Sequence, residues 1–591
     1  MTTYTAPVRD TRFLFEDVFD IYESYTDFPG MSDVTPDLVN AILDEAGKFA
    51  SQEVHPINHS GDKEGCHWAK GKVTTPKGYR EAYEKYTAGG WSQLSESTEF
   101  GGQGLPRVLN GALTEFIMSA SPAFAIYMTR DGSIAAIERN ATQALKNKYL
   151  PNLINGRWSG PMAMTEAHCG SDLGQLRTKA EPQTDGSYKI TGTKIFITGG
   201  ECDLDDNAIH LVLARIPGSP EGIKGISLFL TPRVLVDDDG TLGDANNIYC
   251  SSIEHKMGLN ASATCTINFE DSRGWLVGDV DKGMRAMFAM VNKSRFLIGL
   301  QGTGLSEVAY QNAVAYARER LQMRSLTGPK NPGADADPII VHPDVRRMLL
   351  SQRAFAEGSR ALNTYIGVLF DEQECSENAT RRTQAGHLLD LLTPICKGFG
   401  SEMGTENTNL ALQCFGGHGY IAETGVEQFV RDMRIAQIYE GTTGIQAIDL
   451  LARKILGSQG ETLKLFTDEM GAFCTDHADV EALKMFITPL AELKDQWQQL
   501  ATDIGIAAME KNADELGSAS VDFLMFSGYV TLAYMWAKMA KAALGKDEAF
   551  YRTKLQTAQF YYQRILPRTQ VHAQTMMSGA EYLMNMDANN F

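Results

Sequence analysis

The spacing of apolar residues changes along the chain and divides it into four stretches. From Pro36 to about Ile154, apolar residues recur every three or four positions, for example Val39, Leu43 and Ala46. This spacing places them on one side of a helix and predicts a helical first stretch. A largely small and apolar segment, 112–128, extends the same pattern.

The second stretch, from about Ser159 to Asp279, has short runs of β-branched and aromatic residues instead. The Asp185-Gly186 dipeptide predicts a turn, followed by a strand over Tyr188–Thr198 that is interrupted at Gly192. Similar runs predict three more strands: Ile209–Ala214, Ile226–Leu230 and Thr264–Phe269. We therefore expect an all-β insert between helical stretches.

Helical spacing returns from Gly283 to about Leu456. Residues such as Leu297, Leu300 and Val308 predict a helix with one apolar face, and a loop over Gly328–Asp337 interrupts the pattern.

The last stretch, from about Glu461 to Phe591, is also predicted to be helical. It contains Phe523–Ala537, the longest apolar and uncharged run. This run is shorter than the roughly 18–20 residues that cross a bilayer, so we expect a buried helix and no integral membrane segment.

The four stretches predict an α+β fold with four domains, as befits 591 residues. They are an N-terminal α-helical domain over residues 1–158, a middle β domain over 159–280, a C-terminal helical bundle over 281–460 and an additional helical domain over 461–591.

Charge and cysteine content narrow the range of partners and compartments. The 54 basic and 73 acidic residues give a net charge of −19, which repels phosphate backbones and argues against nucleic acid as a partner. The nine cysteines form no C-x-x-C pair, which is typical of reduced thiols. The first ten residues hold no apolar run of the kind found in secretory signals, so we expect a cytoplasmic protein.

Common nucleotide and metal motifs are missing or incomplete. Gly302-Thr-Gly304 imitates part of a dinucleotide fingerprint, but it lacks a third glycine and no strand precedes it, so we expect close helix packing there. The adjacent pairs Cys66-His67 and His168-Cys169 have no evident further ligand nearby in the sequence. We expect no metal site.

Four short motifs remain, in a fixed order. They are Met162-Ala-Met-Thr-Glu-Ala-His-Cys-Gly-Ser-Asp172, Gly192-Thr-Lys-Ile-Phe-Ile-Thr-Gly-Gly200, Gln413-Cys-Phe-Gly-Gly-His-Gly-Tyr420 and Tyr439-Glu-Gly-Thr-Thr-Gly444. Each alone is a weak signal, because a Thr-Glu pair is commonly a helix cap and a double glycine is commonly a turn. Together and in this order they are specific.

With these motifs the chain resembles the acyl-CoA dehydrogenase family over roughly Pro36–Leu456. The resemblance implies a helical domain, a β domain and a four-helix bundle, with FAD between the β domain and the bundle. It implies an acyl-CoA substrate that loses an α proton to a carboxylate base and a β hydride to the flavin. An electron-transfer flavoprotein is the implied electron acceptor.

The resemblance places the catalytic base at Glu440. Some family members carry the base before the substrate-site arginine, but here that residue is Ser294, which cannot act as a carboxylate base. A carboxyl buried against flavin and an acyl chain should have a raised pKa. The backbone N–H of Glu440 is expected to hydrogen-bond the thioester oxygen.

The resemblance also assigns FAD contacts by motif position. They are Met164, Thr165, Ser171, Phe196, Thr198, Arg320, Gln322, Gln413, Gly416, Gly417 and Thr442. Met164 and Thr165 would contact the pyrimidine edge of the flavin, Thr198 would lie at flavin N5, and Phe196 would pack on the ring face.

Arg320 and Gln322 would contact the pyrophosphate of the FAD bound to a partner subunit, for which a guanidinium is well suited. Gln413, Gly416 and Gly417 would form a turn near the adenosine half of FAD, and Thr442 would lie near a phosphate.

The implied substrate contacts are Ser171, Arg295 and Glu440. Ala167 stands where the family usually has proline, and Gly444 replaces a polar residue, so the geometry near the pyrophosphate departs from the family pattern.

The subgroup that this chain resembles most acts on 3-(methylthio)propanoyl-CoA in dimethylsulfoniopropionate breakdown and has a similar added C-terminal segment. That segment, Glu461–Phe591 here, implies a homodimer. Three alternatives stay open: a dehydrogenase of other short, medium or aromatic acyl-CoAs, an acyl-CoA oxidase, and a non-catalytic binding protein of the same fold. Glu440 and the charge of −19 oppose the last of these.

Overall fold

The chain folds into two compact units, each built from separate segments. The computed structural model describes residues 2–591, apart from the side chains of Phe288 and Ala289. Unit 1 comprises the chain up to Lys48 and residues 107–119 and 295–591. Unit 2 comprises residues 49–106 and 120–294.

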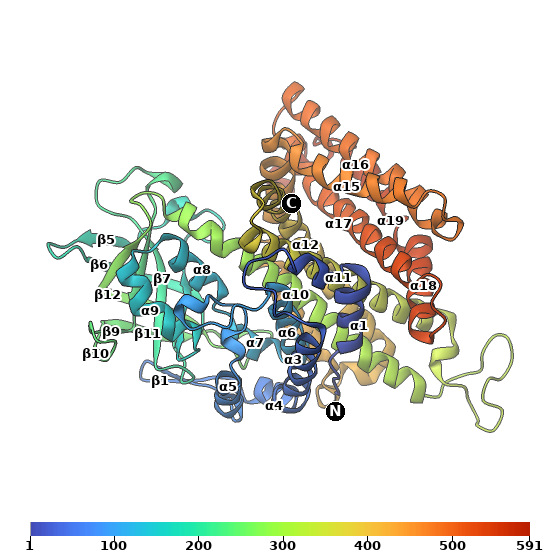
Figure 1. The fold of residues 1–591 in the computed structure, drawn as a ribbon, viewed down its shortest axis with the longest axis horizontal. Helices are drawn as coiled ribbons and strands as arrows, with labels where there is room; N and C mark the ends of the chain where they lie inside the picture. Colours follow the sequence, from blue (N-terminus) through green and yellow to red (C-terminus); the bar gives the residue numbers. More distant parts are fainter. Residues whose placement is uncertain (1) are drawn as a thin grey trace. The chain divides into compact units, whose positions relative to one another are not determined.

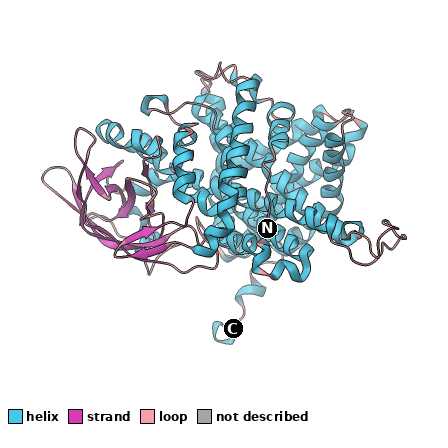
Figure 2. Ribbon diagram, turned by 90° about the horizontal axis from the view of Figure 1, so that it is seen from below, coloured by secondary structure: helices cyan, strands magenta, loops and turns pink. Residues whose placement is uncertain are grey.

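Unit 2 is built around a mixed β-sheet, drawn in magenta in Figure 2. The strand order is β3-β7-β8-β12-β6-β5, with β4 also beside β7 and β11 beside β12. Strands β3 and β4 run parallel to β7, while the other pairings among these strands are antiparallel. The strands are β3 (Trp158–Ser159), β4 (Met162–Ala163), β5 (Lys179–Pro182), β6 (Tyr188–Thr198), β7 (Asn207–Ala214), β8 (Ser227–Pro232), β11 (Ile248–Ile253) and β12 (Thr264–Val277).

Two small hairpin sheets and several helices complete unit 2. The sheets pair β1 (His67–Ala69) with β2 (Lys72–Thr74) and β9 (Val234–Val236) with β10 (Leu242–Ala245). The helices are α4 (His55–Glu64), α5 (Tyr79–Ala88), α7 (Pro122–Met128), α8 (Asp131–Asn140) and α9 (Gln143–Ile154). Ser121 and Thr142 accept hydrogen bonds from backbone N–H groups and cap α7 and α9.

The predicted β insert is present, but two details of its strands were wrong. Strand β6 is continuous through Gly192. A Cβ at this position would lie 2.4 Å from the Thr178 hydroxyl oxygen, so a larger residue would not fit without a shift. Strand β12 does not end at Phe269, because its residues Trp275–Val277 go on to pair with β8.

Unit 1 is helical, and three long helices form its centre. The helices before residue 449 that contribute to it are α1 (Val8–Phe13), α2 (Ile21–Tyr25), α3 (Pro36–Phe49), α6 (Arg107–Ala120), α10 (Gly283–Glu319), α11 (Pro343–Cys375), α12 (Ala379–Phe415), α13 (Val426–Arg434) and α14 (Thr443–Ile448). The predicted loop over Gly328–Asp337 separates α10 from α11. Helix α10 begins in unit 2 and continues in unit 1.

Helix α10 differs from the predicted one-faced helix, because residues 298–309 are buried on every side. Glycines permit this close packing. A Cβ on Gly302 would lie 2.6 Å from the Gly400 carbonyl oxygen, and one on Gly304 would lie 2.8 Å from the Ser119 nitrogen. The Gly302-Thr-Gly304 sequence is therefore a packing motif, as expected.

The last part of unit 1 is helical as predicted and contains α15, α16, α17 and α19 side by side, in orange and red in Figure 1. The helices are α15 (Glu461–Asp476), α16 (Lys484–Glu510), α17 (Asp514–Ala543), α18 (Ala549–Phe560), α19 (Arg568–Met576) and α20 (Glu581–Met584). Helix α17 is long and apolar enough to cross a bilayer, yet Phe523–Ala537 is largely buried by its neighbours. This confirms the prediction of a buried helix.

A buried charge cluster ties distant segments of unit 1 together. Arg360 of α11 donates hydrogen bonds of 2.7 Å to Glu115 of α6 and to Glu307 of α10. Lys554 of α18 pairs with Glu357 of α11 at 2.9 Å and with Asp10 of α1. The α+β fold class, with a helical segment added after the bundle, is thus as predicted from the sequence.

Candidate active site

In unit 2, the predicted flavin-contacting loop lies along β6 and is held there by Lys194. The Lys194 side chain is fully buried and donates to the Met164 carbonyl and to the Glu166 carboxylate, both at 2.9 Å. The Ile195 N–H donates to the Thr165 carbonyl at 2.9 Å. These bonds fix Met164 and Thr165, which are both half-buried, beside the strand.

Glu166 is the centre of this arrangement. Besides Lys194, its carboxylate accepts from the N–H of Arg177 at 2.7 Å and from the N–H and hydroxyl of Thr178 at 3.0 and 2.6 Å. Burial opposes ionisation, but the Lys194 charge and these donors outweigh it and lower the pKa of Glu166 to about 2. The loop is therefore anchored by an ionised, fully hydrogen-bonded carboxylate.

Phe196 lies in a β-bulge and faces outward. Residues 195 and 196 of β6 oppose the single residue Thr266 of β12, and Phe196 has a left-handed φ of +59°. This conformation costs a non-glycine residue about 1–2 kcal/mol. The ring is nevertheless 59% exposed. A strained backbone that presents an aromatic ring to the outside indicates a binding surface.

The other predicted residues of unit 2 lie nearby in the sequence. Thr198 ends β6 opposite Thr264 and is half-buried, and Ser171 is exposed.

The structure also adds a third group to the His168-Cys169 pair, because ligand atoms of Glu166, His168 and Cys169 lie within 4.8 Å of one another. The Glu166 carboxylate already accepts hydrogen bonds from Arg177, Thr178 and Lys194. The expectation of no metal site stays a prediction.

In unit 1, Arg320 and Gln322 follow the end of α10 and are exposed. Among the residues that the structure describes, the Arg320 guanidinium makes no hydrogen bond or ion pair. Asp337 holds the adjoining loop by accepting from the N–H groups of Ser325, Lys330 and Asn331 at 2.7–2.9 Å.

The Gln413 motif lies at the end of α12. Gln413, Gly416 and Gly417 are exposed, and Gly416 has φ +59° and ψ −140°, a conformation that favours glycine. A Cβ on Gly417 would meet no atom within 4 Å. Internal packing therefore does not explain the glycine at 417.

Glu440 lies on a left-handed turn between α13 and α14. Glu440 and Gly441 have φ values of +53° and +88°, which is costly for a glutamate. Two side chains hold the turn: Gln446 donates to the Glu440 carbonyl at 2.9 Å, and Lys397 donates to the Gly441 carbonyl. Tyr439 is held as well, by a hydrogen bond to Gln301.

The Glu440 carboxyl is half-buried, and its amide N–H has no partner among the described residues. Burial raises the pKa of the carboxyl above its ordinary value, although the positive charges of Lys397 and, less strongly, Arg295 lower it. The turn therefore offers a carboxyl of raised basicity and a free N–H donor.

Arg295 and Thr442 have partners within the chain. Arg295 is buried and forms an ion pair with Asp449. The Thr442 hydroxyl accepts from the Ile445 N–H at 3.3 Å and caps α14. Their roles at the acyl-CoA and at a phosphate stay predictions.

Family models account for the chain from residue 37 to 587 in four consecutive matches. They are the acyl-CoA dehydrogenase N-terminal domain over 37–157, the middle domain over 161–272, the C-terminal domain over 281–456, and an acetyl-CoA dehydrogenase C-terminal-like domain over 466–587. A 3-methylmercaptopropionyl-CoA dehydrogenase of Ruegeria pomeroyi is 41% identical over 95% of this chain and 96% of its own length. The chain belongs to the acyl-CoA dehydrogenase family.

Other relatives agree. A broad-specificity linear acyl-CoA dehydrogenase of Mycobacterium tuberculosis is 32% identical and covers 96% of both chains. The solved structure of an acyl-CoA dehydrogenase from Bacillus anthracis, complexed with FAD, matches with a TM-score of 0.71. It covers 96% of this chain and 91% of its own at 21% identity, which shows the shared fold. The protein is thus an oxidoreductase of this family.

The residues predicted for this acyl-CoA dehydrogenase fall into two groups, one in each unit. Met164, Thr165, Ser171, Phe196 and Thr198 belong to unit 2, and the other predicted residues belong to unit 1.

Three residues that support these groups were missed from the sequence: Lys194, Lys397 and Gln446. A signal was present for Lys397, which is the only charged residue in the apolar segment 391–400.

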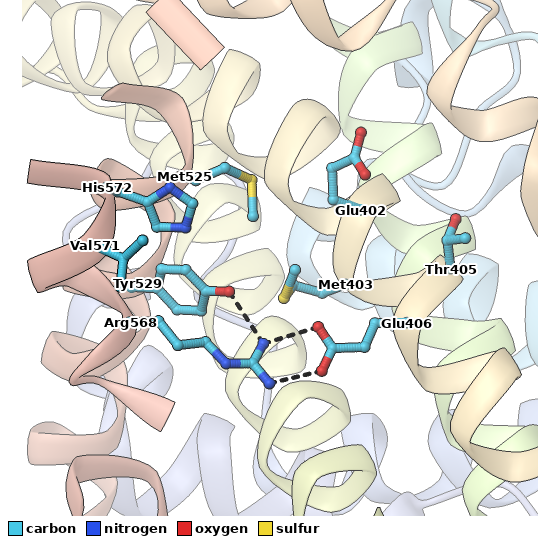
Figure 3. A pocket seen from close by; sticks show the side chains of 9 residues that line it. All are labelled: Glu402, Met403, Thr405, Glu406, Met525, Tyr529, Arg568, Val571 and His572. Atoms are coloured by element: carbon cyan, nitrogen blue, oxygen red, sulfur yellow. Dashed lines mark hydrogen bonds and ion pairs between the residues drawn. The ribbon is translucent and has the colours of Figure 1, made fainter. Parts of the chain in front are cut away.

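A groove lies where α12, α17 and α19 meet (Figure 3). Its volume is about 520 Å³. The lining residues are Glu402, Met403, Thr405, Glu406, Met525, Tyr529, Arg568, Val571 and His572. Arg568 is already paired with Glu406 across it, and the sequence pattern did not predict the groove.

Proposed function

We propose that this protein is an FAD-dependent dehydrogenase that converts 3-(methylthio)propanoyl-CoA to 3-(methylthio)acryloyl-CoA, with Glu440 as the base. The observation that carries the proposal is the Glu440 turn. It presents a carboxyl whose pKa is raised, next to an amide N–H that has no hydrogen-bond partner in the described part of the chain. The matched family and the 41% identity to the Ruegeria enzyme support the reaction type and the substrate.

In this proposal, the Glu440 carboxylate removes the α proton beside the thioester carbonyl. A raised pKa makes the Glu440 carboxylate a stronger base for the α proton. The Glu440 N–H donates to the thioester oxygen, where negative charge develops as the proton leaves. One residue thus supplies both the base and a stabilising hydrogen bond.

The residues present fit FAD. Phe196 offers an exposed ring on a bulge, and Thr165 and Thr198 are half-buried on the same β structure. Arg320 offers an unpaired guanidinium suited to a pyrophosphate, and Gly417 leaves open space. Met164, Ser171, Gln322, Gln413, Gly416 and Thr442 complete the proposed contacts. When bound, FAD accepts the hydride from the β carbon.

Glu440→Gln tests the base. The variant should retain FAD and its yellow colour, because the amide is close in size to the carboxyl. Anaerobic bleaching of the flavin by the acyl-CoA should slow by about 10²–10⁴-fold, since the proton acceptor is lost. Glu423→Gln, an exposed glutamate, is the matched control. Bleaching at near wild-type rate in Glu440→Gln would reject the proposal.

A panel of acyl-CoAs tests the substrate. The methylthio chain should give the highest kcat/KM against straight, branched and aromatic chains of similar length. The relative from Mycobacterium tuberculosis is a broad-specificity linear acyl-CoA dehydrogenase, so equal rates across straight chains would assign this chain to that kind of specificity instead.

The electron acceptor, the oligomer and the compartment belong to the same proposal. We propose an electron-transfer flavoprotein as acceptor, a homodimer and a cytoplasmic location. Slow reoxidation of the reduced flavin by air, with fast reoxidation by an electron-transfer flavoprotein, would support the acceptor. Fast reoxidation by air would indicate an oxidase. Light scattering on the FAD-loaded protein gives the oligomeric state.

A further inference from the structure

The turn that carries Glu440 does not hold itself in place. Two consecutive residues, Glu440 and Gly441, adopt left-handed backbone conformations. A glutamate keeps such a conformation only where its surroundings enforce it. The carbonyl of each residue is bound by one side chain from a helix: Gln446 of α14 binds the first, and Lys397 of α12 binds the second.

A buried lysine is an unusual donor for a backbone carbonyl such as that of Gly441. The Lys397 side chain is fully buried, and its ammonium forms no ion pair within 4 Å among the residues that the structure describes. Burying an ammonium without a carboxylate partner is unfavourable. A neutral side chain would pack in the same apolar segment of α12 at lower cost, so packing alone does not account for the lysine.

Three charged side chains lie near the Lys397 ammonium: Glu440, Glu402 and Arg295. Burial lowers the pKa of the Lys397 ammonium to about 8, and Glu440 and Glu402 oppose this while Arg295 adds to it. Glu402 accepts hydrogen bonds from Thr443 and Gln437, and Arg295 of α10 is paired with Asp449. Among the described residues, Glu440 is therefore the nearby carboxyl that neither accepts a hydrogen bond, as Glu402 does, nor forms an ion pair, as Asp449 does.

Helix α17 fixes the position from which Lys397 acts. A Cβ on the next residue, Gly398, would lie 2.6 Å from Leu524 of α17 and 3.2 Å from the Cβ of Gln446. Helices α12, α14 and α17 therefore approach closely at this point. The close packing at Gly398 therefore supports both side chains that hold the turn, Lys397 and Gln446.

We propose that Lys397 is a positioning residue for the dehydrogenation: its ammonium holds the Glu440-Gly441 turn through the Gly441 carbonyl, and its positive charge favours the carboxylate form of Glu440. The inference rests on the proposed function, in which Glu440 is the base. It adds a residue of α12 that acts through Glu440 and touches no substrate atom.

The test is anaerobic stopped-flow reduction of the FAD-loaded enzyme by 3-(methylthio)propanoyl-CoA between pH 5 and 9. The rate should rise with pH as Glu440 ionises. Lys397→Met should move this rise to higher pH by about one pH unit, because the lost charge had favoured the carboxylate. The limiting rate should fall by about 10–100-fold, while the acyl-CoA concentration at half-maximal rate changes less than threefold.

Lys397→Arg keeps the charge and should leave the pH of the rise unchanged, with a partial recovery of the rate. Lys538→Met, which removes a partly buried lysine of α17, should not move the pH of the rise. If Lys397→Met does not fold, Lys397→Gln replaces it, and the same upward shift in pH is expected.

A rise at unchanged pH in the neutral variants would overturn the inference, as would an unchanged limiting rate. Glu440→Gln separates this from a failure of the proposed function. If Glu440→Gln still reduces its flavin, then Glu440 is not the base. If Glu440→Gln is inactive and Lys397→Met behaves like wild type, only the role of Lys397 is rejected.

Discussion

Arg568 of α19 and Glu406 of α12 form a two-point ion pair in which both Nη–Oε distances are 2.8 Å. Figure 3 shows the pair crossing the groove between the two helices, with a third hydrogen bond of 3.2 Å from Arg568 to the Tyr529 hydroxyl. The pair joins the added helical segment to a helix that also carries Lys397. Bidentate geometry makes it stronger than an ordinary surface pair.

Arg568→Met should therefore lower the free energy of unfolding by about 1 kcal/mol, since the pair is partly exposed and screened. Urea unfolding of the purified protein measures the change, which should shrink in high salt. Arg564→Met, which removes an exposed arginine of the same segment, should have no measurable effect. Equal stabilities of the two variants would show that the pair contributes nothing.

Phe196→Gly should separate backbone strain from cofactor binding. Glycine adopts the φ of +59° without cost, so the FAD-free protein should be as stable as wild type or more stable. FAD binding should weaken at least about tenfold, because the exposed ring is gone. Fluorescence titration of the FAD-free protein measures the affinity. Tyr249→Ala, on strand β11 of the same sheet and 50% exposed, should leave the affinity for FAD unchanged.

Arg320→Ala should lower FAD occupancy. The guanidinium has no partner among the residues that the structure describes, so its removal should not change the melting temperature of the FAD-free protein. Loss of a charge-assisted contact to a phosphate should weaken retention of FAD on gel filtration by about 10-fold or more. Arg318→Ala, also exposed near the end of α10, is the control. Full retention by Arg320→Ala would reject the pyrophosphate role.

Glu166→Gln should change how stability depends on pH. The pKa of Glu166 falls from an ordinary value of 4.5 to about 2 on folding, so the ionised carboxylate stabilises the fold fully above about pH 4.5. This contribution is lost as the pH falls toward 2. The variant should be about 2–3 kcal/mol less stable at pH 7.

The difference in free energy of unfolding between wild type and Glu166→Gln should become smaller as the pH is lowered from 6 to 3.5. Denaturant unfolding at each pH measures it. Glu181→Gln, an exposed residue of β5, should show a constant difference near zero. If the difference in free energy of unfolding between wild type and Glu166→Gln stays constant with pH, ionisation of Glu166 does not account for its contribution to stability.

The fold was largely predictable because apolar spacing marks helices and strands directly. The burial of α10 on every side was not, since it depends on glycines that meet residues nearly a hundred positions away, as Gly302 meets Gly400. The motifs identified Glu440 and Phe196, because both lie in short local patterns. Their left-handed conformations were not evident from the sequence, as only glycine signals such a φ reliably.

The supporting residues were missed for a different reason. Lys194 and Glu166 are 28 positions apart, and Lys397 lies 43 positions before Glu440. Each pairing is created by the tertiary fold, so the local sequence does not show which partner either lysine has. A single lysine within an apolar helical run, as at Lys397, indicates a buried charge with a specific partner.

The burial of α17 also sets an order of events during synthesis. This helix packs against α12 and α14, made earlier, and against α18 and α19, made afterwards. Until α18 and α19 have left the ribosome, a nascent chain therefore exposes a helix as apolar as a membrane span. The helical bundle of this enzyme reaches its final packing only after α18 and α19 have been made, and chains that end before α18 should be captured by chaperones or degraded.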